Sequence, residues 1–178
     1  MLAALFASHP EHCLAAALLL ARLADIGSTR LATPNLRLEM NPLARMLGWP
    51  FAWATLGLCV LPYVADWGSA AAVPVIVMSL FVSASNLSRA WVMRTVGEDE
   101  YLAFMRGAFA RARPSLVYGS IAVSGALTAS AGLLLMLFYP DPEAWAHDFA
   151  LGIVLYAAAL VLHSTVHARR MFSAAASV

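Results

Sequence analysis

Five long apolar runs dominate this chain and limit what it can fold into. An α-helix needs about 20 apolar residues to cross the hydrocarbon layer of a membrane. In lipid, only helices and closed barrels satisfy their own backbone hydrogen bonds, and these runs are too long for strands. The sequence therefore predicts an all-α polytopic membrane bundle with five transmembrane helices. The runs cover about residues 11–30, 48–66, 70–93, 115–139 and 148–168, within a single transmembrane domain of residues 1–178.

The composition agrees with a membrane protein and excludes several other classes. Hydrophobic residues make up 62% of the chain and charged residues 12%, whereas soluble domains carry about 25% charged residues. A net charge of +1 gives no indication of a nucleic-acid partner. Every basic residue is arginine and alanine is abundant, as in proteins from GC-rich bacterial genomes. We therefore expect a multipass protein of the bacterial inner (cytoplasmic) membrane, with membrane lipids as its surroundings.

Arginine marks every second loop between the apolar runs. The segment before the first run, the second loop around residues 66–68 and the fourth loop around residues 139–145 contain none. The positive-inside rule then predicts an N-out, C-in orientation. Aromatic residues near the ends of the runs are typical of a membrane interface: Trp49, Trp67, Trp91, Tyr139 and Trp145. The arginines of the first loop, the third loop and the tail are Arg30, Arg37, Arg45, Arg94, Arg106, Arg111, Arg113, Arg169 and Arg170.

The third loop has a pattern of its own. Residues 98–113 place Tyr101, Leu102, Met105 and Phe109 on one helical face, with acids at the start and arginines at the end. This order suits the helix dipole. It predicts an amphipathic interfacial helix on the cytoplasmic surface. The alternative is a simple connector whose arginines contact anionic lipid.

Polar residues in and beside the runs are expected to meet at one level. With a rise of about 1.5 Å per residue, the arginine-based orientation places them all toward the cytoplasmic side of the bundle. Charged groups inside membrane helices are costly and often mark function. The predicted layer consists of Asp25, Glu39, Asn41, Asn86, Arg89, His163 and His167.

Two pairs within this layer each allow two interpretations. Arg22 and Asp25 are three residues apart, so they could form only a structural ion pair, or Asp25 could keep lone pairs for another partner. His163 and His167 share one helix face. With Asp25 they form a predicted site for a divalent metal such as zinc. The alternative is a pair of interfacial histidines near lipid head groups.

The loop before the second run also allows two interpretations. Asn41 is a good N-cap and Pro42 suits the first helical position, so the pair could simply start a helix. The segment 31–40 is apolar for a loop, and it could instead fold back into the bundle. A re-entrant loop of this kind would carry Glu39 beneath the ends of the first and fifth runs.

Small residues recur every four positions in the fourth run. We expect them to form a close-packing seam with another helix, within the chain or in a homo-oligomer. The residues are Ser120, Ser124, Thr128 and Gly132.

The polar motif around the first loop resembles one known group of proteins. Asp25-x3-Thr29 followed by Glu39-x-Asn41-Pro42-Leu43 is similar to a signature of small multipass prokaryotic membrane proteins of unknown function. The match covers about 20 residues, with Ser28-Thr29 where the family usually has two threonines. The resemblance implies a multipass helical fold and no particular activity.

Three functions are compatible with these observations. The first is a hydrolase or transferase acting on a lipid or lipid-linked substrate, with the metal at Asp25, His163 and His167 and with Glu39 as general base. Arg89, Asn41, Asn86, Arg106 and Arg111 would then hold the substrate or assist the reaction. The second is a small ion- or proton-coupled transporter or channel. The third is a structural or assembly subunit of a larger membrane complex.

Overall fold

The computed structural model describes residues 9–64, 68–141 and 145–175, and in these ranges the chain is helical without any strand. Five of the described helical stretches are long and apolar enough to cross a membrane, which confirms that part of the prediction. The elements are α2 (Pro10–Ala32), α3 (Pro42–Ala54), η1 (Thr55–Val60), α4 (Leu61–Val64), α5 (Gly68–Val96), α6 (Glu98–Arg111), α7 (Pro114–Phe138) and α8 (Trp145–Ala175).

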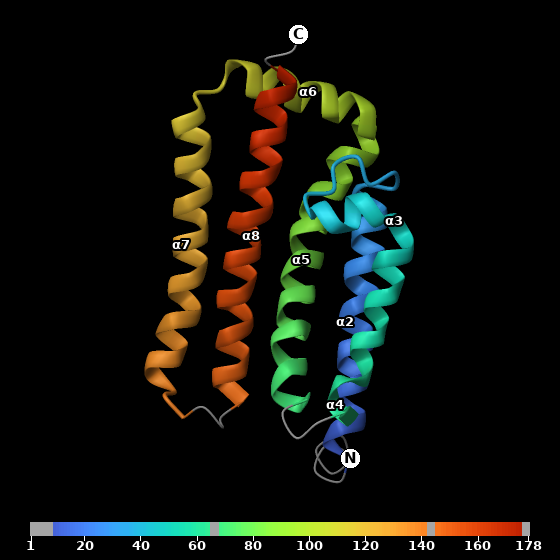
Figure 1. The fold of residues 1–178 in the computed structure, drawn as a ribbon, viewed down its shortest axis with the longest axis vertical. Coiled ribbons are helices and arrows are strands. Elements are labelled where there is room, and N and C mark those ends of the chain that lie inside the picture. Colours follow the sequence, from blue (N-terminus) through green and yellow to red (C-terminus); the bar gives the residue numbers. More distant parts are fainter. Residues whose placement is uncertain (1–8, 65–67, 142–144, 176–178) are drawn as a thin grey trace.

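The long helices stand side by side and alternate in direction (Figure 1). Helix α2 packs against α5, α5 against α8, and α8 against α7. The second apolar stretch is built from α3, η1 and α4, and it lies beside α2 and α5. Helix α6 crosses the end of the bundle at which α8 finishes, and it packs on α8 (Figure 1).

Helix α6 confirms the helical pattern predicted for the third loop. All four residues of its apolar face are partly buried, while Arg106 and Arg111 are exposed. Phe109 makes an edge-to-face contact with Phe172 of α8, with ring centroids 5.1 Å apart. Aromatic pairs of this geometry add to the hydrophobic contact. Helix α6 is therefore fastened across the end of the bundle by its apolar side.

Most of the predicted interface aromatics have exposed rings in the structure. Trp91, Tyr139 and Trp145 are all exposed. Trp49 differs, because its indole N–H donates to the carbonyl of Pro34 and Arg30 lies over its ring. Trp67 and most of the second loop lie outside the described residues.

The contact between α7 and α8 corrects the small-residue seam predicted within the chain, while a seam in a homo-oligomer stays a prediction. Gly125 and Gly132 are buried against α8, whereas Ser120 and Ser124 are exposed. A spacing of four residues drifts by about 40° per step around a helix, while a spacing of seven drifts by only about 20°. The close approach is therefore carried by two glycines seven residues apart, of which the prediction contained one.

Gly132 should tolerate no side chain. A Cβ at this position would lie 2.7 Å from the carbonyl oxygen of Ala150 and 2.8 Å from Val154. Overpacking of this kind costs about 1–3 kcal/mol, so we expect Gly132→Ala to lower the thermal unfolding midpoint in detergent. Gly119→Ala is the matched control, since a Cβ added at Gly119 would meet nothing within 4 Å. Equal midpoints for the two variants would contradict the close packing of α7 on α8.

Candidate functional site

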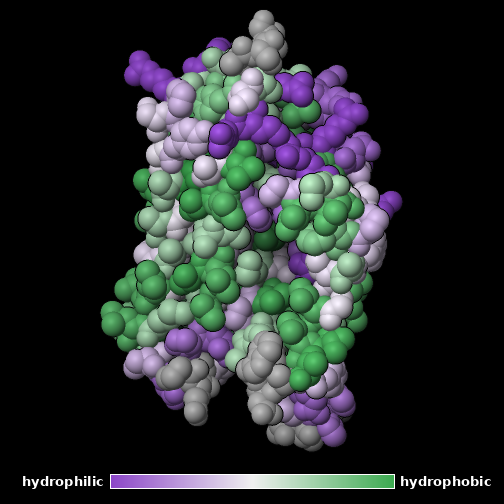
Figure 2. Space-filling view, viewed as in Figure 1, coloured by the Kyte–Doolittle hydropathy of each residue, from purple (hydrophilic) through white to green (hydrophobic). Residues whose placement is uncertain are grey.

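A cavity of about 380 Å³ lies between the second apolar stretch and the helices α2, α5 and α8. Figure 2 shows hydrophilic residues gathered toward the ends of the bundle, a mostly hydrophobic band between them, and a hollow in the middle of this face. The loop between α2 and α3 also contributes to the cavity wall. Polar groups from separate parts of the chain line the cavity: Arg22, Asp25, Thr29, Glu39, Asn41, Thr55, Ser79, Ser85, Asn86 and His163.

Arg22 contacts polar side chains from three parts of the chain at this cavity. Its guanidinium group pairs with Asp25 on the same helix, donates to Ser79 of α5 at 3.1 Å, and donates to Thr55 of η1. Both members of the ion pair are mostly buried, with side chains about 14% and 15% exposed. One cation thus neutralises Asp25 and also links three neighbouring apolar stretches.

Asn86 makes a second polar link between α2 and α5. Its side-chain N–H group donates to the Thr29 hydroxyl at 2.9 Å and lies 3.4 Å from the Ser28 hydroxyl. Ser28 in turn donates to the backbone carbonyl of Asp25 at 2.9 Å. These bonds hold the α2 face that carries Asp25 at a fixed rotation toward the cavity.

The second apolar stretch is broken where it forms the cavity wall. Gly48 has φ +70° and ψ −160°, and Pro50 follows two residues later. Residues Thr55–Val60 then continue as a 3₁₀-helix before α4. Irregular backbone at membrane depth is tolerated where it lines a cavity, and Gly48 does line this one. The Gly48-Trp-Pro50 sequence signals such a break, which the prediction of a single membrane helix over about residues 48–66 did not place there.

The loop between α2 and α3 folds back over one end of the cavity. Leu36 and Leu38 are buried, and Glu39 and Asn41 reach the cavity wall. Leu36 adopts φ +55°, an uncommon value for a side chain of this size. The loop therefore covers this end of the cavity, while its re-entrance into the membrane stays a prediction.

The Glu98 carboxylate on α6 accepts several hydrogen bonds from this loop, and we call this set of bonds the Glu98 clasp. Glu98 accepts hydrogen bonds from the Thr33 hydroxyl, from the backbone and side-chain N–H groups of Asn35 at 3.2 and 3.0 Å, and from the Arg37 backbone N–H at 3.0 Å. Arg37 also pairs with Asp99. Partial burial alone would raise the pKa of Glu98, but these hydrogen bonds outweigh it and hold the pKa below its usual value.

The clasp should weaken in acid. Because the pKa of Glu98 is lower in the folded protein, its stabilising effect is complete above the ordinary value of 4.5 and is lost as pH falls through the folded value. We expect Glu98→Gln to lower the unfolding midpoint at pH 7 and to make a progressively smaller difference as pH falls below 4.5. Glu100→Gln, at an exposed position in the same helical turn, is the control. A pH-independent effect of Glu98→Gln would contradict the clasp.

Glu39 and Asn41 play different parts at the end of the loop. The Asn41 side chain caps α3 by accepting from the backbone N–H groups of Leu43 at 3.0 Å and Ala44 at 3.4 Å. Glu39 accepts the backbone N–H of Asn41 at 2.8 Å. Burial raises the pKa of the Glu39 carboxyl, and the nearby Asp25 carboxylate raises it further despite the hydrogen bond. Glu39 is thus a carboxyl group of raised pKa in the cavity wall.

The structure brings five of the predicted site residues to one cavity and leaves four outside it. Those at the cavity are Asp25, Glu39, Asn41, Asn86 and His163. Arg89, Arg106 and Arg111 are exposed and do not line it. His167 lies one helical turn beyond the cavity, where its Nδ1 contacts the Arg170 guanidinium at 3.1 Å and its ring meets Phe109.

The structure therefore does not bring the three predicted metal ligands to one place. Asp25, His163 and His167 were grouped by depth and helical spacing, but spacing along α8 could not show that His167 belongs to the α6 contact. Among the described residues, the group of three metal-binding side chains with mutually close ligand atoms lies elsewhere, at the start of α2. Arg22, Thr55 and Ser79 were not expected as one network, because no local pattern links three separate stretches.

Comparison with protein-family models, with curated proteins and with solved structures finds no match for this chain. The resemblance of the Asp25 to Leu43 segment to a family of multipass membrane proteins stays a prediction.

Proposed function

We propose that this protein is an N-out, C-in protein of the bacterial inner membrane that binds an amphipathic molecule of the bilayer and acts on it as a hydrolase or transferase. The orientation is supported by the arginine-bearing loops, which share the α6 end of the bundle with the end of α8 (Figure 1). Positive residues favour the cytoplasmic side. In this orientation α6 lies at the cytoplasmic interface and the Glu39 loop faces the cytoplasm.

The amphipathic lining of the cavity carries the proposal. Its polar groups gather around Arg22, Asp25, Glu39 and Asn86, and the rest of the wall is apolar. Ligand sites are mostly apolar pockets with a few placed polar groups that fix orientation. A molecule with a polar head and a hydrocarbon tail matches both parts of the lining. The apolar wall includes Phe51, Leu58, Val75, Met78, Val82, Tyr156 and Leu160.

The charge balance of the polar groups favours particular head groups. Arg22 already neutralises Asp25, so it offers no free positive charge to a ligand. Glu39 adds a negative charge when it ionises. A head group that donates hydrogen bonds or carries positive charge therefore suits the cavity better than a phosphate with two charges.

Glu39 is the residue to which we assign proton transfer. A carboxyl group with a raised pKa lies closer to the pH at which a general base works best. In the proposed reaction Glu39 accepts the proton of a water or hydroxyl group as that oxygen attacks an ester carbonyl of the substrate. The tetrahedral intermediate then collapses, the bond to the alcohol oxygen breaks, and Glu39 returns the proton to this leaving oxygen. Asn86 and His163, which line the same cavity, position the head group.

The binding step is tested by filling the cavity. Ala159 lines the cavity, whereas the neighbouring Ala158 is exposed on α8. We expect the protein purified from membranes to retain an amphiphile that mass spectrometry of an organic extract detects, and Ala159→Phe to abolish its retention. Ala158→Phe is the matched control and should retain it. Equal retention of the amphiphile by both variants would show that it does not bind in the cavity.

A proton-coupled transporter is the second candidate, and the broken second stretch favours it. Transporter sites are often formed by discontinuous helices near the middle of the membrane. Here the break at Gly48 lines the same cavity as the protonatable Glu39. In proteoliposomes a transporter would move protons with its substrate, and Glu39→Gln would stop this movement. Turnover of a bilayer molecule without any proton flux favours the enzyme.

A further inference from the structure

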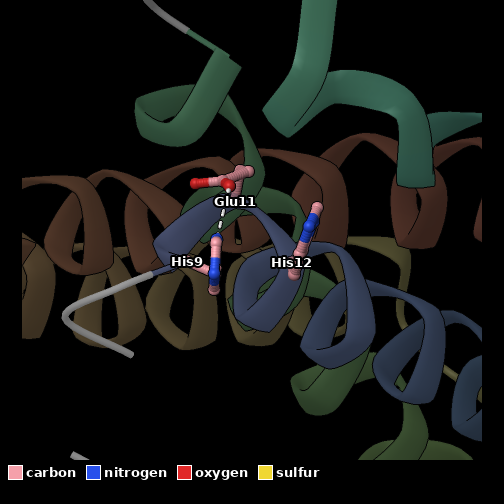
Figure 3. Close-up of side chains that lie close together, drawn as sticks. All are labelled: His9, Glu11 and His12. Atoms are coloured by element: carbon pink, nitrogen blue, oxygen red, sulfur yellow. Dashed lines mark ion pairs between the residues drawn. The ribbon is translucent and has the colours of Figure 1, made fainter. Parts of the chain in front are cut away.

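A second cluster of polar side chains lies at the end of the bundle away from α6, where α2 begins. His9, Glu11 and His12 occupy the N-cap position and the first turn of α2, on either side of Pro10. Figure 3 shows the three side chains close together, with His9 facing Glu11. None of these residues lines the cavity that holds Glu39.

The geometry brings three potential metal ligands together. One ligand atom from each residue lies within 4.8 Å of the others. The Nδ1 atom of His9 is 3.7 Å from a Glu11 carboxylate oxygen, and the two imidazole rings stack with centroids 5.3 Å apart. Two imidazoles and one carboxylate form the ligand set of many zinc sites that keep an open fourth position.

The orientation of His12 is fixed from a different part of the chain. Its Nδ1 atom lies 2.9 Å from the Tyr63 hydroxyl of α4. This contact occupies one ring nitrogen and leaves Nε2 for a metal. Histidines that bind metals usually engage their other ring nitrogen with a neighbouring group, which fixes the tautomer and the ring direction. The Tyr63 hydroxyl therefore fixes the ring direction of His12, as a second contact does at known metal sites.

From these contacts we propose that His9, Glu11 and His12 bind one divalent transition-metal ion, with zinc as the first choice. The N-terminus of a helix by itself disfavours a cation, and the Glu11 carboxylate supplies the compensating negative charge. Zinc bonds of about 2.0–2.1 Å place tetrahedral ligands about 3.4 Å apart. Small rotations of side chains that are 56% and 36% exposed, those of His9 and Glu11, reach this spacing.

The test uses the full-length protein in detergent, carrying no histidine tag. It is stripped with a chelator and titrated with Zn²⁺ against a chromogenic competitor. We expect one equivalent to bind to the wild type and none to the His9→Gln/His12→Gln variant. His147→Gln is the matched control, because His147 lies near the start of α8 at the same end of the bundle. It should bind like the wild type.

Two further variants separate this site from the cavity and from a general loss of structure. Tyr63→Phe keeps every ligand and should weaken Zn²⁺ binding by about tenfold, the size expected when a group that orients a metal ligand is lost. Asp25→Asn/His163→Gln should bind like the wild type. The proposal is overturned if the His9/His12 variant still binds one equivalent while retaining wild-type helicity. It is equally overturned if only the Asp25/His163 variant loses the ion.

Discussion

We expect Arg22→Leu to destabilise the bundle strongly, by about 3–5 kcal/mol. The substitution leaves the mostly buried Asp25 carboxylate without its cation and removes the donors to Thr55 and Ser79. An unpaired charge in such a place costs far more than the pair itself contributes. Thermal or denaturant unfolding in detergent, followed by circular dichroism, measures the effect.

A double substitution separates the lost charge balance from lost packing. Arg22→Leu/Asp25→Leu removes both charges, and replacing a buried ion pair by apolar residues is often neutral or stabilising. We therefore expect the double variant to recover most of the lost stability. If it is as unstable as Arg22→Leu alone, the contacts to Thr55 and Ser79 matter more than the pairing with Asp25.

Glu39→Gln should abolish turnover and yet stabilise the protein. Loss of a general base typically slows a reaction by about 10²–10⁴-fold. Glutamine keeps an oxygen that can accept the Asn41 backbone N–H but cannot ionise. Because burial raises the pKa of Glu39 in the folded state, ionisation of Glu39 costs stability as pH rises from the ordinary value of 4.5 through the folded value.

The pH dependence of the stability difference is the sharper measurement. The free energy of unfolding of Glu39→Gln relative to wild type should be near zero below the ordinary pKa of 4.5, should grow as pH rises through the folded pKa, and should then level off. Glu39→Asp, which keeps the carboxyl group, is the control and should retain the pH dependence of the wild type. A Glu39→Gln protein that still converts the bound amphiphile would exclude Glu39 as the base.

Much of the fold was predictable because apolar run length is a strong and local signal. The five long apolar helical stretches follow directly from it, and arginine counting placed Asp25, Asn86 and His163 at one level. The Asn41-Pro42 pair indicated a helix start, and the apolar segment 31–40 indicated a folded-back loop as the alternative. The structure contains both, since Asn41 caps α3 while Glu39 reaches the cavity.

The remaining features depend on contacts between parts of the chain that are far apart. Depth and helical spacing placed His167 with His163, but only the position of α6 shows that the His167 ring faces Phe109. The clasp of Glu98 on the loop joins residues more than sixty positions apart. The His9, Glu11 and His12 cluster was missed for another reason: it lies at the opposite end of the bundle from the predicted cytoplasmic layer, on which the choice of ligands rested.

The exposed position of the second stretch has a consequence for how the proposed ligand reaches the cavity. Among the five apolar stretches in the described ranges, it has the smallest buried share, and α3 buries none of its residues. It packs mainly through η1 and α4, on α2 and α5. We therefore expect the proposed amphiphile to reach the cavity sideways from the bilayer, past this wall. Occupancy would then follow the mole fraction of the ligand in the membrane, and diluting the bilayer with inert lipid should empty the site at constant aqueous volume.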